Sequence, residues 1–119
     1  MADIQEMATA LGQALGRTPE YQALDRAIQR ADDDRDMVEL RNEIQKLEGE
    51  VQAALGRGEQ PTQEQAEQYE AALRRLQALA SYQSVVAAQT NFDKIMARVN
   101  EAIHVGMRDG ASSRIIIPS

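Results

Sequence analysis

Apolar residues recur every three or four positions along most of this chain, a spacing that predicts α-helices. The first predicted helix covers residues 2–15, and Gly16 is placed to end it in a left-handed C-cap. Thr18 and Pro19 begin the second, because a threonine N-cap followed by proline is a helix-start signal. That helix runs to the acidic residues 32–34, which we expect to cap the next helix and to be solvated.

The third predicted helix, residues 35–55, has the most regular pattern. Its apolar residues follow a strict seven-residue repeat, the spacing of a coiled-coil seam. A seam this narrow on a helix this long is typical of an extended helical hairpin and not of a broad globular core. The repeating positions are Met37, Leu40, Ile44, Leu47, Val51 and Ala54.

Residues 56–61 break the pattern with glycine and proline. Thr62 and Gln65 then form a capping-box signature for a fourth helix that continues to about Ala80. A fifth helix is predicted over residues 83–107, with Gly106 and Gly110 marking its end. We therefore expect one helical domain over residues 1–107 and a C-terminal tail, 108–119.

These elements predict an all-α fold of about five helices, with a long antiparallel helical hairpin. Narrow-seamed helices leave apolar surface for another chain to cover, so we expect a helical bundle completed by dimerisation, a two-fold homodimer being the commonest assembly. The predicted interface residues are Met37, Leu40, Ile44, Leu47, Val51, Val85, Phe92, Ile95, Val99 and Ile103.

Composition narrows the function. The 119 residues carry a net charge of −6 and no basic block, which argues against direct binding of nucleic acid or of an anionic membrane surface. There is no cysteine, which excludes disulfides and thiolate metal sites. The N-terminus has no signal-peptide pattern and no segment is long and apolar enough to span a bilayer, so the expected compartment is the cytoplasm.

Glu101 and His104 are the most interesting chemical pair. A glutamate and a histidine three positions apart share a helix face, as in di-iron carboxylate bundles, and a dimer would bring two copies together. Such a site needs further glutamates projecting inward, and acids are so common here that the pair arises easily by chance. We therefore expect no metal or other cofactor, and keep this pair as an alternative.

The tail ends in Ile115, Ile116 and Ile117, three residues of high β-propensity. Such an end can add to the edge of a partner's sheet or fill a partner's groove. The alternatives are docking on its own dimer and a frayed terminus.

The opening Ala8-x-x-Leu11-Gly12-x-x-Leu15-x-x-Thr18-Pro19-Glu20-Tyr21 resembles the start of the YlbF/YmcA (YheA-like) family of small helical bacterial proteins. The acidic break before a heptad helix, the loop ending in Pro61 and the long last helix are similar too, over about residues 1–107. The resemblance implies intertwined dimers or higher oligomers, no active site, and regulatory roles in complexes tied to RNA degradation and developmental switches. Some members carry cysteines linked to iron–sulfur clusters, and this chain has none. Its tail after Met107 also departs from the family pattern.

The sequence thus favours a non-catalytic helical adaptor or regulator that acts by protein–protein association with an unidentified partner. Two alternatives stay open. One is a small di-iron-type bundle using Glu101 and His104 from each chain of a dimer. The other is a structural subunit of a larger assembly, tethered by its C-terminal tail.

Overall fold

The computed structural model describes residues 3–116, and the side chains of residues 3–112. That part of the chain is all-α and contains no strand, as the sequence predicts. Its five helices are α1 (Ile4–Gly16), α2 (Pro19–Asp33), α3 (Arg35–Gly56), α4 (Gln63–Ala78) and α5 (Ala80–Ile116).

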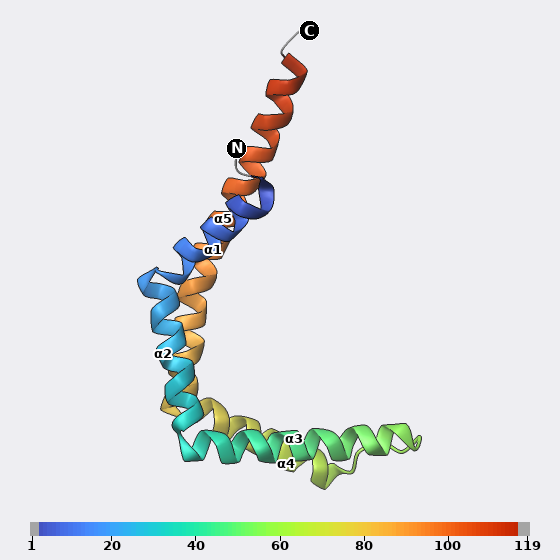
Figure 1. Ribbon diagram of the computed structural model, residues 1–119. Coiled ribbons are helices and arrows are strands. Elements are labelled where there is room, and N and C mark those ends of the chain that lie inside the picture. The colour runs from blue at the N-terminus through green and yellow to red at the C-terminus, as the bar shows by residue number, and fades with distance from the viewer. Residues whose placement is uncertain (1–2, 117–119) are drawn as a thin grey trace.

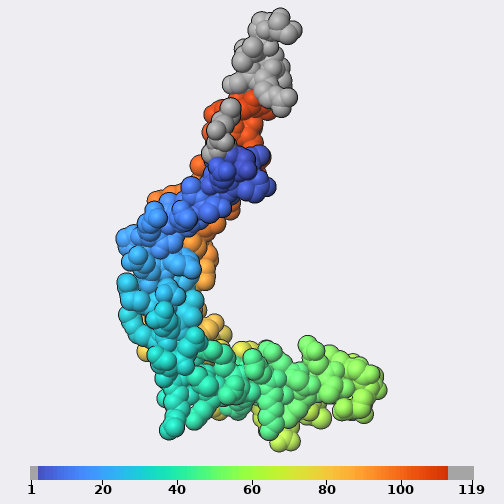
Figure 2. Space-filling model, viewed as in Figure 1, coloured from blue at the N-terminus to red at the C-terminus, as the bar shows by residue number. Residues whose placement is uncertain are grey.

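The helices form two arms that meet at a sharp bend (Figures 1 and 2). The hairpin arm consists of α3 and α4, and the long arm consists of α5 with α2 packed along it and α1 beyond α2. The molecule measures 70 × 37 × 20 Å, with a radius of gyration of 22.1 Å. A compact domain of this length has a radius of gyration of about 13.5 Å, so the chain is far from globular.

The predicted helix starts are confirmed by their capping bonds. The Thr18 hydroxyl accepts from the backbone N–H of Tyr21 at 3.1 Å. Thr62 and Gln65 form a reciprocal capping box, with bonds of 3.0 and 3.1 Å. Asp34 caps α3 by accepting from the backbone N–H of Asp36, so the acidic break does act as a cap. Each cap satisfies a backbone donor that the helix itself leaves unpaired.

The seven-residue repeat of α3 packs against α4, which confirms the predicted antiparallel hairpin. Ile44 and Leu47 are buried with Ala72 in the core of this arm. Polar contacts fix the register at its edges: Arg75 pairs with Glu43 at 3.0 Å, and the Tyr69 hydroxyl donates to Glu48 at 3.1 Å. The side chains of Tyr69, Leu73 and Leu76 complete the cluster.

Both chain crossings between the arms occur at single residues in extended conformation. Asp34 separates α2 from α3, and Leu79 separates α4 from α5. The Ser81 hydroxyl donates to Asp34 at 2.7 Å and so ties the start of α5 to the opposite crossing. This bond and the cap bond from Asp36 both favour the carboxylate, and they lower the pKa of Asp34.

In the long arm, α2 and α5 run antiparallel. The end of α2 meets the start of α5 through Asp34 and Ser81, and the start of α2 meets α5 where the Tyr21 and Phe92 rings pack edge to face, 5.4 Å apart. The buried residues that α2 contributes are Leu24, Ala27 and Ala31. Beyond Phe92, α5 continues for 24 residues past the start of α2.

The predicted end of the fifth helix is wrong. It begins at Ala80 instead of residue 83 and passes through Gly106 and Gly110 to Ile116. Glycine ends a helix when it adopts a left-handed conformation, and among the described residues only Gly58, in the hairpin loop, has a positive φ. Gly106 and Gly110 cost the helix stability without ending it. Residues 108–116 are therefore helical in this structure.

Leu47→Ala should destabilise the protein by about 2–5 kcal/mol, because Leu47 is only 6 % exposed and its removal leaves a cavity between α3 and α4. Urea unfolding followed by circular dichroism measures the loss. Leu55→Ala on the same helix is the matched control, since Leu55 is 54 % exposed and should cost far less. Equal losses in the two variants would contradict the assignment of this seam to the core.

Asp34 should make stability depend on pH. Its lowered pKa means that the folded state favours the carboxylate, so its contribution is fully present above the pKa of an unfolded aspartate, about 4. That contribution is lost as the pH falls through the lower folded pKa. In Asp34→Asn, which keeps a capping side chain, the drop in melting temperature between pH 6 and pH 3 should be smaller than in wild type. Asp33→Asn, an exposed neighbour, is the control and should retain the wild-type drop.

Candidate interaction surface

The predicted interface residues on α3 lie mostly inside a single chain. Met37, Leu40, Ile44 and Leu47 are all buried, and Val51 is half-buried. Because the same chain already covers these side chains, they have little surface to offer a second chain.

The predicted residues on α5 are progressively less covered along the helix. Val85, Phe92, Ile95 and Val99 are half-buried, and Ile103 is 46 % exposed. From residue 100 to residue 112 every side chain is exposed, including those of Val105 and Met107. The distal part of α5 therefore presents apolar residues to solvent.

Helix α1 contributes no buried residue, although it is clearly amphipathic. Its apolar stripe consists of Ile4, Met7, Leu11 and Leu15, of which Ile4 is 76 % and Met7 is 55 % exposed. Helix α1 lies at the same end of the molecule as the distal part of α5 (Figure 1). The sequence predicts this stripe, but stripe residues alone do not indicate whether their own chain covers them.

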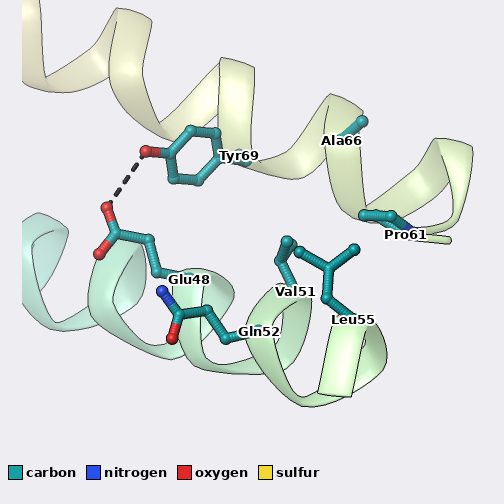
Figure 3. A pocket seen from close by; sticks show the side chains of 7 residues that line it. All are labelled: Glu48, Val51, Gln52, Leu55, Pro61, Ala66 and Tyr69. Carbon is teal, nitrogen blue, oxygen red and sulfur yellow. Dashed lines mark hydrogen bonds between the residues drawn. The ribbon is translucent and has the colours of Figure 1, made fainter. Parts of the chain in front are cut away.

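A second apolar feature lies near the tip of the hairpin arm. Glu48, Val51, Gln52 and Leu55 on α3 face Ala66 and Tyr69 on α4 across an open groove of about 380 Å³, which Pro61 closes at the loop (Figure 3). The hydrogen bond to Glu48 raises the pKa of the Tyr69 phenol. The sequence shows these residues only as parts of two helices and a loop, so this tip groove could not be anticipated from the pattern.

Glu101 and His104 are both exposed, on the distal part of α5. They line an open hollow with Met107 and Arg108, all from the same helix. Nowhere in the described residues do three or more His, Cys, Asp or Glu side chains gather so that they could hold a metal ion. Within the described part of one chain, therefore, this pair does not belong to a larger cluster of metal-binding side chains.

The apolar tail lies at the edge of what the structure describes. The backbone of Ile115 and Ile116 belongs to α5, while their side chains and the whole of Ile117 lie outside the described residues. Among the described helices, none has a stretch long and apolar enough to cross a bilayer.

A family model described as control of competence regulator ComK, YlbF/YmcA, matches residues 4–108. The chain belongs to the YlbF/YmcA family. The match spans α1 and all but the last turns of α5, so it includes both arms and confirms the resemblance seen in the sequence. A comparison with curated proteins finds no match. The family's description is that of a regulator, and this YlbF/YmcA chain is accordingly a member of a regulatory family.

Proposed function

We propose that this YlbF/YmcA chain is a non-catalytic adaptor that regulates other proteins by binding them, and that it does so as a cytoplasmic homodimer. The family supports the regulatory part of the proposal. The composition supports the non-catalytic part, because a single histidine and no cysteine leave few means of building a Ser–His or Cys–His nucleophile. The observation that carries the proposal is the uncovered apolar surface of α1 and distal α5.

The exposed area is larger than that of a compact monomer of this mass, which supports self-association. The single chain exposes 9157 Å², whereas a compact monomer of 13.2 kDa exposes about 6,400 Å². A stable dimer of standard size buries roughly 800 Å² on each partner. The difference between these two exposed areas is therefore about three times the area that one partner buries in such an interface.

The stripe of α1 and the distal part of α5 are the surface that a second chain would cover. Ile4 and Met7 on α1, with Ile103 and Met107 on α5, are more exposed than apolar residues of a folded core. In the single chain nothing packs within 4 Å of the Cβ position at Gly12, so α1 also has room for a close helix neighbour. Covering these faces with the same faces of a second copy gives a two-fold, self-complementary interface.

Met7→Asp and Ile103→Asp should each dissociate the dimer, because a carboxylate in an apolar interface must be desolvated without a partner. Light scattering after size exclusion should give twice 13.2 kDa for wild type and one chain mass for the variants. Leu55→Asp is the matched control, an equally exposed leucine on the other arm, and should remain dimeric. A wild-type protein of single-chain mass would reject the dimer.

Regulation by binding is tested by purifying the tagged protein from its native cells. An adaptor should recover a partner protein in a fixed ratio, and the ratio should be measured again after residues 108–119 are deleted. A partner lost on deletion would favour a tail-tethered subunit. Stoichiometric iron or manganese that disappears in His104→Ala would replace the adaptor with the metal-binding alternative.

A further inference from the structure

The net charge of the protein is concentrated at the tip of the hairpin arm. Residues 48–70 carry six acids and one base, a net charge of −5, whereas the remaining 96 residues carry thirteen acids and twelve bases. The one base in this stretch, Arg57, already pairs with Glu59 at 3.4 Å. The tip thus carries most of the net negative charge, and the charges of all other residues sum to −1.

This acidic tip is also where the tip groove lies. The groove is lined mostly by apolar side chains from α3, α4 and the loop, with the polar Glu48 and Gln52 beside them. Leu55 on its wall is 54 % exposed. Glu48 lies on the same wall, held by the Tyr69 hydroxyl (Figure 3). An apolar groove between two helices, on a segment whose net charge is −5, is the complement of an amphipathic helix with basic flanks.

We propose that the tip groove binds a basic amphipathic helix of a partner protein, with an apolar side chain of that helix seated against Val51, Leu55 and Tyr69. The inference rests on the proposed adaptor function and assigns it a docking site and a partner chemistry. Apolar contact holds the helix in the groove, while the acidic tip speeds its encounter and rejects acidic partners.

The two interaction surfaces are then separate. The dimer uses α1 and distal α5 on the long arm, and the partner uses the far end of the hairpin arm (Figure 2). In a two-fold dimer each chain presents its own tip groove, so the assembly offers two equivalent docking sites. The distal part of α5 from a second copy is the competing occupant, because residues 94–116 carry four bases and two acids beside exposed apolar residues.

The test uses the full chain and synthetic peptides as probes. One peptide is an amphipathic helix of about four turns, with a leucine stripe flanked by lysines. A second replaces the lysines by glutamate, a third replaces the leucines by serine, and a fourth is residues 94–116 of this chain. Because the chain has no cysteine, Gln52→Cys gives one site in the groove for an environment-sensitive dye, and Gln45→Cys gives a reference site outside it.

The leucine–lysine peptide should bind and shift the emission at position 52 but not at position 45. Leu55→Ser should weaken its binding by about tenfold, as expected for losing one apolar contact of a leucine. Glu70→Lys should weaken it by about threefold at low salt and have little effect at high salt. Glu39→Lys, the same charge change near the corner of α3, should leave binding unchanged.

Three results would overturn the proposal: equal binding of the glutamate or serine peptide, equal binding by Leu55→Ser, or tighter binding of the peptide from residues 94–116. The last result would make the occupant a second copy. Chain mass is measured on the same samples. A normal dimer that does not bind the leucine–lysine peptide rejects the tip groove alone, and a monomer that binds it rejects the dimer alone.

Discussion

Two helices packed side by side bury only the stripe that each turns toward the other. Each arm of this molecule consists mainly of one such pair of helices. In the hairpin arm the stripe is the seven-residue repeat of α3 against α4. In the long arm it is the face of α2 against the first third of α5. Outside these two stripes, the apolar side chains that the structure describes are exposed or at most half-buried. The elongated shape, the exposed α1 and the open tip groove all follow from this single constraint.

The helix caps can be predicted from the sequence, whereas the helix that packs against each apolar stripe cannot. Thr18, Thr62 and Asp34 cap helices as expected, because a cap depends on residues within one turn. The repeat of α3 was recognised as a seam, but the same spacing fits a helix of the same chain or of another. Here the same chain covers it, so four of the ten predicted interface residues are core residues.

Glycine was the other source of error. Helix α1 does end at Gly16, as the sequence predicts, but through a right-handed cap at Arg17 and not through a left-handed glycine. Gly106 and Gly110 do not end α5, and the one described residue with a left-handed φ is Gly58 in the loop. A glycine permits a left-handed turn without requiring it, and the outcome depends on whether the following residues can continue the helix. The tip groove was missed for a related reason: its wall needs the register between α3 and α4, which Arg75, Glu43, Tyr69 and Glu48 fix only in the folded chain.

The seven-residue repeat has a consequence for how such a protein can change over evolutionary time. Two turns of helix carry seven residues, so inserting or deleting one heptad in α3 and one in α4 returns every later residue to the same face. The arm would grow or shrink by about 10 Å, while the corner held by Asp34 and Ser81 kept its geometry. A single-residue insertion in α2 or α5 would instead rotate one helix face by about 100° and uncouple the two crossings. We therefore expect the length of the hairpin arm to tolerate insertions and deletions best, and the corner between the arms to tolerate them least.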